Sequence, residues 1–278
     1  MSFDALLRAG ALSARDVADL RFFGVAGALV PADDAAAPAT AAGVRRGWDA
    51  VVLAVRRLRR AGLGAFAAVG VHPRRIPLRG LEALLAERPG ALGRPEVVAV
   101  GLVGLAAGGE LEERVLARQL ELARELRLPV LVETPRRGKE RLTRRALALL
   151  REAEVEPGRA LVVGADERTV RAVRACGHLA GLSLSSSGRG AEGIEAAVSL
   201  VRALGPEGLV LASDAGLGGG DLLALPRAAD RLARSGLSEG VVRRVCGANA
   251  LAFLGADPAA VARGDRAPRP RTRGARTR

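Results

Sequence analysis

Aromatic and histidine side chains are scarce in this chain. Aromatic residues make up 2% of the 278 residues, tyrosine is absent, and the two histidines are His72 and His178. The core therefore has to be built from Ala, Val and Leu, and the hydrophobic content of 49% is sufficient for one. Two histidines also cannot form a histidine-rich metal cage, because a zinc hydrolase site needs about three protein ligands plus a water.

Cysteines and long hydrophobic runs are equally scarce. Cys176 and Cys246 are far apart and form no CxxC or Cys/His cluster, which argues against a disulfide framework and a zinc site. We expect both to be small buried residues in a reducing compartment. Every apolar run is broken by Arg, Pro or Gly before it reaches membrane-spanning length, and the first residues do not resemble a signal peptide. These features predict a soluble, cytoplasmic protein without a membrane partner.

Lysine is nearly absent, although the chain is strongly basic. Lys139 is the single lysine among 43 basic residues, and the abundance of Arg, Ala and Gly indicates a GC-rich coding bias rather than a functional excess of arginine. The formal net charge is +13, to which residues 263–278 contribute seven Arg and one Asp. We expect residues 256–278 to be a disordered basic tail. It is either a solvated segment without a dedicated partner or a weak nucleic-acid contact that acts by counterion release.

The sequence is organised around an apolar run at residues 97–105. The run is rich in Val, punctuated by Gly and free of alternating polar side chains, so it predicts a strand buried on both faces of a parallel sheet. A helical pattern follows at 110–126, and a second buried strand follows at 128–135. Further strands are predicted at 24–31, 66–71, 160–163, 179–185 and 209–214, with a candidate eighth at 3–9. Further helices are predicted at 13–22, 48–61, 81–88, 139–151, 167–175, 191–204, 221–235, 239–246 and 249–254.

This alternation of strands and helices predicts one α/β domain, a (β/α)8 TIM barrel over residues 1–255. An open doubly wound sheet is the alternative, but its GxGxxG signature does not follow a first strand here. Chemistry in a barrel sits at the C-terminal ends of the strands. The polar residues predicted there are His72, Glu133, Asp166, Glu167, Ser185, Ser186, Ser187 and Asp214. His178 precedes a strand, so we expect it at the opposite, structural end.

Several short segments follow one another along residues 24–254. They lie at 71–73 (Val-His-Pro), 98–105, 118–123, 128–135, 212–214 (Ala-Ser-Asp) and 249–254. In this order they resemble the TatD family of metal-dependent hydrolases, and in particular its TatD-related TIM-barrel branch. The resemblance implies an amidohydrolase-type barrel with one or two divalent metals at the C-terminal strand ends. It also implies kinship with nucleases and phosphoesterases.

The same resemblance implies where the metal ligands would stand. The family's ligands are two histidines on strand one, a bridging glutamate, two further histidines and a final aspartate. At these positions this chain has, in order, Leu6, Arg8, Leu102, Glu133, about Gly164 and Asp214. Because leucine and glycine side chains offer no lone pair, we expect an eroded site. Glu133 and Asp214 are the two family positions that can still coordinate a metal.

The sequence leaves three functions open. The first is a pseudoenzyme, a binding or scaffold protein that keeps the barrel without a cofactor and without family-type nuclease or phosphoesterase activity. The second is a hydrolase in which Glu133 and Asp214 either are the catalytic acid/base pair or, alone or with Asp166, bind magnesium weakly. The third is nucleic-acid or phosphate binding through the Arg-rich body and tail.

Overall fold

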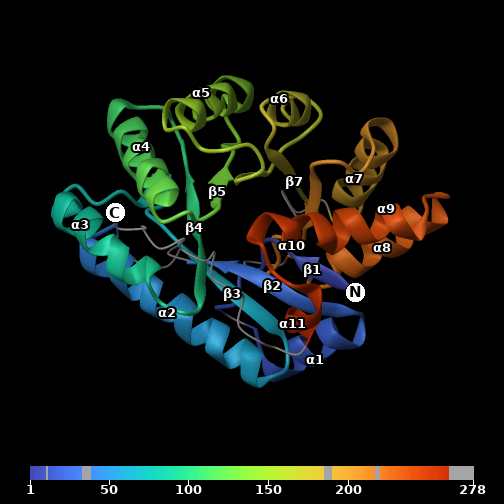
Figure 1. The fold of residues 1–278 in the computed structure, drawn as a ribbon. Helices are drawn as coiled ribbons and strands as arrows, with labels where there is room; N and C mark the ends of the chain where they lie inside the picture. The colour runs from blue at the N-terminus through green and yellow to red at the C-terminus, as the bar shows by residue number, and fades with distance from the viewer. Residues whose placement is uncertain (11, 33–38, 185–189, 217–219, 263–278) are drawn as a thin grey trace, which may run out of the picture.

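The strands of this protein form a barrel in the computed structural model, which describes residues 1–10, 12–32, 39–184, 190–216 and 220–262. Eight strands pair in parallel and in sequence order, and the helices form a ring around them (Figure 1). The strands are β1 (Ser2–Asp4), β2 (Val25–Pro31), β3 (Gly64–Val69), β4 (Val97–Gly104), β5 (Val130–Glu133), β6 (Ala160–Val163), β7 (Leu179–Ser183) and β8 (Leu209–Ala212). The predicted (β/α)8 barrel is confirmed.

The helices connect successive strands and then close the chain. They are α1 (Ala14–Phe22), α2 (Ala41–Arg60), α3 (Leu81–Leu92), α4 (Glu110–Glu125), α5 (Lys139–Glu152), α6 (Val170–Ala175), α7 (Gly190–Leu204), α8 (Ala224–Arg234), α9 (Glu239–Arg243), α10 (Asn249–Leu254) and α11 (Pro258–Ala262). A 3₁₀ turn, η1 (Pro73–Arg75), follows β3, and a π-helical turn, η3 (Arg244–Ala248), precedes α10. In the described part of the chain, no helix is both long and apolar enough to cross a membrane.

The first strand is shorter than the predicted range of 3–9. After β1 the Asp4 carboxylate accepts a hydrogen bond from the backbone N–H of Leu6 at 3.1 Å, and this local bond bends the chain out of its extended path. The chain then closes the barrel against the end of β8. Asp214 N donates to Leu6 O at 3.0 Å, and Arg8 N donates to Ala215 O at 2.9 Å.

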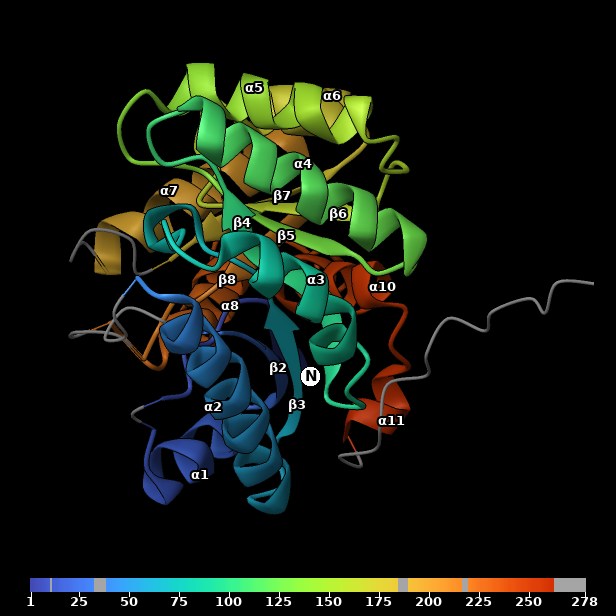
Figure 2. The ribbon, with the colours of Figure 1, turned by 90° about the vertical axis from the view of Figure 1, so that its left-hand side faces the viewer.

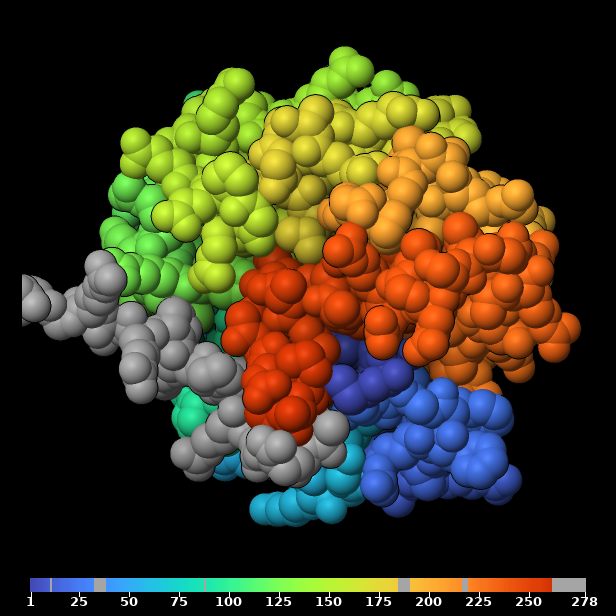
Figure 3. Space-filling model, turned by 45° about the vertical axis from the view of Figure 1, so that its right-hand side comes forward, coloured from blue at the N-terminus to red at the C-terminus, as the bar shows by residue number. Residues whose placement is uncertain are grey.

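The barrel interior is apolar and is covered at one end by the C-terminal helices. Ala250, Leu251 and Phe253 of α10 pack into the same cluster as the interior residues of the strands. Val261 of α11 is 1% exposed and lies over β2 and β3, where a Cβ atom at Gly27 would come within 2.7 Å of its Cγ1. Helix α10 contacts β1 and β8, whereas α11 lies beside β2 and β3 (Figure 2), and Figure 3 shows both helices in the middle of one face. Glycine in β2 therefore makes room for this cover.

The packed part of the chain continues past the predicted boundary at residue 255. Ala256 is 8% exposed and α11 ends at Ala262, so seven residues that we assigned to the tail belong to the packed structure. The short apolar segment has no periodicity long enough to predict a helix. The rest of the predicted tail, 263–278, lies outside the described residues, as do Ser185, Ser186 and Ser187.

Helices α2 and α3 are longer than predicted, whereas α6, α8 and α9 are shorter. Helix α2 begins at Ala41 rather than at residue 48. The sequence pattern missed its first turns because Gly43 and Gly47 are poor helix formers. Helix α3 continues through Pro89 to Leu92 instead of ending at 88. Helix α6 begins at Val170 rather than at 167, because residues 166–169 form a hydrogen-bonded turn before it.

The cysteines are not both buried, as we had expected. Cys246 is buried in η3, and burial raises the pKa of its thiol to about 12. Cys176 is exposed at the C-terminal cap of α6, so the expectation is wrong for this residue.

Candidate functional site

Two pairs of interacting side chains lie at the barrel mouth, the end at which the strands finish. Arg8, just beyond β1, places its Nε 2.9 Å from Oδ1 of Asp214, just beyond β8. His72, beyond β3, places its Nε2 2.7 Å from Oε2 of Glu133, the last residue of β5. These side chains are between 14% and 24% exposed. Sequence positions up to 206 residues apart thus meet in one partly buried site.

The end of β3 is clamped, and this clamp positions His72. Gln119 of α4 is 1% exposed. Its Oε1 accepts a hydrogen bond from Val71 N at 2.7 Å, and its Nε2 donates to Val71 O at 3.1 Å. Trp48 of α2 donates from Nε1 to Gly70 O at 2.9 Å. Two outer helices therefore fix the backbone that carries the imidazole.

Both ring nitrogens of His72 have partners. The backbone N–H of Arg74 donates to Nδ1 at 3.2 Å, which assigns the proton of the neutral ring to Nε2, facing Glu133. Burial raises the pKa of Glu133, but the His72 hydrogen bond and the charges of His72, Arg74 and Arg8 outweigh it and lower that pKa below its usual value. Glu133 is therefore an ionised acceptor, and the charge of Arg8 reaches both carboxylates of the mouth.

A third carboxyl group lies directly below the mouth. Asp4 is 1% exposed. Its Oδ1 accepts from Ser213 N at 3.0 Å, and its Oδ2 accepts from the Ser213 hydroxyl. Burial is the largest influence on Asp4 and raises its pKa to about 6, against the lowering effect of the hydrogen bonds from Ser213 and Leu6. The Asp214 charge raises it further. Asp4 ties β1 to the end of β8, next to the Asp214 backbone.

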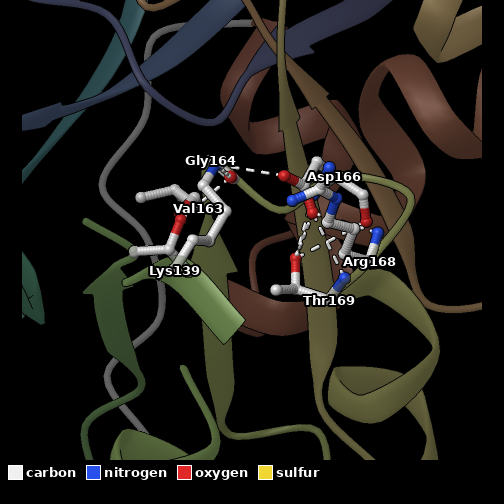
Figure 4. Close-up of polar contacts among 7 residues, drawn as sticks. Lys139, Val163, Gly164, Asp166, Arg168 and Thr169 are labelled. Carbon is white, nitrogen blue, oxygen red and sulfur yellow. Dashed lines mark hydrogen bonds and ion pairs between the residues drawn. The ribbon is translucent and has the colours of Figure 1, made fainter. Parts of the chain in front are cut away.

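The end of β6 has an ammonium group where the resemblance places a metal-binding histidine. Gly164 has no side chain, and its carbonyl accepts a hydrogen bond from Lys139 Nζ at 2.7 Å (Figure 4). The same Nζ lies 3.6 Å from Oδ2 of Asp166. The other oxygen of Asp166 accepts from Thr169 N and Oγ1 at 3.2 and 3.0 Å and from Arg168 N at 3.1 Å. Asp166 thus caps the turn before α6.

Two of the six positions at which the resemblance implies metal ligands have hydrocarbon side chains. Leu6 is 2% exposed and Leu102 is 3% exposed, and both belong to the apolar cluster of the barrel interior. No group of three His, Cys, Asp or Glu side chains that could hold a metal ion occurs among the residues that the structure describes. Of the six positions that the resemblance implies as metal ligands, Glu133 and Asp214 carry side-chain oxygens. The two carboxylates are engaged by a guanidinium and an imidazole, and the neighbouring positions offer no lone pair.

Comparison with known proteins identifies the family. A model of the TatD related DNase family matches residues 28–215. The chain belongs to the TatD family. An uncharacterized metal-dependent hydrolase of Methanocaldococcus jannaschii is 30% identical over 181 residues, which cover 65% of this chain and 70% of that protein. Metal dependence is a property of that relative.

Solved structures agree with this assignment. A TatD-like protein from Archaeoglobus fulgidus has 26% identity and a TM-score of 0.75, over 91% of this chain and 99% of that one. The phosphotriesterase homology protein of Escherichia coli, solved with phosphate in its active site, has 16% identity and a TM-score of 0.70. The similarity covers 91% of this chain and 98% of the Escherichia coli protein. At 16% identity it supports a shared fold and nothing more. The TatD-like barrel is thus shared over nearly the whole described chain.

The structure brings together three of the eight mouth residues predicted from the sequence. Glu133, Asp214 and His72 meet at the mouth, whereas Asp166 is a cap and His178 lies before β7 at the other end. The roles of Arg8, Asp4 and Lys139 could not be predicted from the sequence. Arg8 was visible only as a missing histidine, and its pairing with Asp214 has no local sequence signal.

Proposed function

We propose that this TatD-family barrel acts as a binding protein and does not carry out metal-dependent phosphoester hydrolysis. The observation that supports this most strongly is the 2.9 Å ion pair between Arg8 and Asp214. Asp214 is the carboxylate that the family pattern reserves for a metal, and here it accepts a hydrogen bond from a guanidinium. A fixed positive charge beside it also opposes the approach of a divalent cation.

The remaining positions support the same proposal. Glu133, the other family position able to coordinate, accepts a hydrogen bond from His72. Lys139 adds a further positive charge at the end of β6, next to Gly164. The mouth therefore offers guanidinium, ammonium and carboxylate groups for polar recognition of a ligand, with hydrocarbon at Leu6 and Leu102 below them.

A second candidate is hydrolysis by the carboxylates themselves, and the His72–Glu133 pair favours it. An imidazole 2.7 Å from the carboxylate holds Glu133 in one orientation, as a general base requires. The pKa of Glu133 is lowered, so the carboxylate is ionised but weakly basic at neutral pH. In this case the activity would rise as Glu133 ionises in the acid range and would be lost in E133Q.

An assay of the hydrolysis of bis(4-nitrophenyl) phosphate and of DNA tests the proposal. Each substrate is assayed in the presence of Mg²⁺, Mn²⁺ or Zn²⁺ and, separately, in the presence of EDTA. We expect no turnover above that of D214A under any of these conditions. Metal-stimulated turnover that EDTA removes would contradict the proposal. Turnover that persists in EDTA and disappears in E133Q would establish the second candidate instead.

A variant with restored ligands serves as the positive control. Leu6→His, Arg8→His, Leu102→Glu and Glu133→His together return four of the implied family ligands to the mouth, and we expect this variant to gain metal binding. Gly164→His is left out, because Gly164 has φ +73° and a Cβ atom there would lie 3.0 Å from Thr134 Oγ1.

A further inference from the structure

A cavity of about 640 Å³ lies at the other end of the barrel from the mouth. Arg127 precedes β5 and Arg159 precedes β6, so both line the cavity where these strands begin. Arg124 and Glu154, at the ends of α4 and α5, form another part of the lining. Leu128 and Val155 supply apolar wall. The cavity shares no residue with the mouth site.

Two of the lining residues have a backbone conformation that favours glycine. Arg127 and Glu154 both have φ +54°, and each is the residue after the C-terminal cap of its helix, α4 or α5. At the same position after α1, α2, α6 and α8 the chain has glycine: Gly24, Gly62, Gly177 and Gly236. Among the described residues, one further residue other than glycine has a positive φ, and it is Asp214 in the mouth. Strained positions of this sort gather at functional sites, and two of the three described ones line this cavity.

The charges in the cavity leave an excess of guanidinium. Arg124 Nη1 lies 2.6 Å from Oε2 of Glu154, so these two neutralise each other. Arg159 donates from Nη2 to the carbonyl of Arg127. Burial lowers the pKa of Arg159, and the charge of Glu156 raises it in part. After the Arg124–Glu154 pair, the cavity lining has two guanidinium groups, those of Arg127 and Arg159, and one carboxylate, that of Glu156. An oxyanion would restore the balance and accept hydrogen bonds from both guanidinium groups.

We propose that this cavity binds a small organic molecule with a phosphate or carboxylate group, which Arg127 and Arg159 hold while Leu128 and Val155 contact its apolar part. The volume suits a small ligand. Arginine recognises both oxyanions through paired N–H donors. The site is independent of the proposed function of the mouth, because it uses neither the Arg8–Asp214 pair nor the His72–Glu133 pair.

Isothermal titration calorimetry of the full chain with phenyl phosphate, inorganic phosphate and benzoate tests the proposal. We expect saturable one-site binding of phenyl phosphate or benzoate, with the preferred one identifying the oxyanion, and weaker binding of inorganic phosphate, which lacks an apolar part. R127G and R159A should each weaken binding at least about tenfold, the change expected for one charge-assisted hydrogen bond. R151A is the matched control. Arg151 lines a neighbouring groove but not this cavity, so the affinity should stay unchanged.

The choice of glycine at position 127 separates a ligand-binding role from a structural one. Glycine adopts φ +54° without strain, and R127G keeps the carbonyl that Arg159 contacts, so its melting temperature should not fall below that of the wild type. Lost affinity with retained stability supports the proposal. A destabilised R127G, unchanged affinity in R127G and R159A, or no binding of any of the three probes would overturn it.

Discussion

Asp4 joins the first strand of the sheet to the last through a carboxyl group that has almost no contact with solvent. It accepts hydrogen bonds from Leu6 N, Ser213 N and the Ser213 hydroxyl, and its pKa rises from the ordinary 3.8 to about 6 because it is buried. The folded protein therefore binds this proton more tightly than the unfolded chain does. The contribution of Asp4 to stability is full below pH 4 and is lost as pH rises through about 6.

This linkage gives a prediction for Asp4→Asn. The asparagine oxygen can keep the two backbone donors, and its amide can donate to Ser213, so the fold is retained without an ionisable group. The shift from 3.8 to about 6 corresponds to about 3 kcal/mol of unfolding free energy lost by the wild type across this pH range. Urea denaturation between pH 4 and 7 should show this fall in the wild type relative to Asp4→Asn. Parallel pH profiles for the two proteins would contradict it.

At the scale of elements, the mouth is positioned by helices that do not themselves reach it. Helix α4 holds the end of β3 through both polar atoms of Gln119, and α2 adds the Trp48 hydrogen bond to Gly70 O. Directly after the clamped residues Gly70 and Val71, the chain enters η1, and His72 is the N-terminal cap of this turn. The orientation of the imidazole toward Glu133 therefore depends on packing outside the barrel.

Gln119→Leu tests this clamp. The substitution leaves the N–H and C=O of Val71 buried without their partners, at a cost of about 1–3 kcal/mol for each group. We expect unfolding free energy in urea to fall by about 2–4 kcal/mol. Arg114→Ala on the exposed face of the same helix should change it by less than about 0.5 kcal/mol. Equal effects of the two substitutions would show that the clamp contributes little.

The elements themselves were largely predictable from the sequence, whereas the contacts between them were not. Buried strands in a parallel barrel are continuous apolar runs, so the sequence predicts β2 to β8. The bend after Asp4 depends on a side chain bonding to the backbone, and it shortened β1 relative to the prediction. The Arg8–Asp214 pair joins the two ends of the barrel sequence, and only the closed sheet brings them together. Lys139, at the start of α5, reaches the carbonyl of Gly164 at the end of β6, again without a local pattern.

At the scale of the whole molecule, the C-terminal helices complete the barrel. Helix α11 covers β2 and β3, and Val261 packs where Gly27 and Gly64 leave room. A chain that ends at residue 255 loses this cover, and burial of one valine alone contributes about 1.5–3 kcal/mol. A chain that ends at residue 262 keeps it.

The two truncations should therefore differ in thermal stability. We expect the chain ending at 262 to melt at nearly the wild-type temperature, and the chain ending at 255 to melt several degrees lower. Differential scanning calorimetry of the two measures this directly. A lowered melting temperature for the longer truncation would show that residues 263–278 also stabilise the fold. Equal melting temperatures for both would show that α11 is dispensable.

Metal stoichiometry tests the central claim most directly, which is that contacts of Arg8 and His72 with two carboxylates have replaced metal coordination at the mouth. The protein would be dialysed against Zn²⁺ or Mn²⁺ at equilibrium, and the bound metal would be measured by elemental analysis beside the variant with restored ligands. We predict no stoichiometric metal in the wild type and a gain in the variant, since Arg8 and His72 engage the two carboxylates that remain. One equivalent of metal in the wild type, lost in Asp214→Ala, would contradict the account.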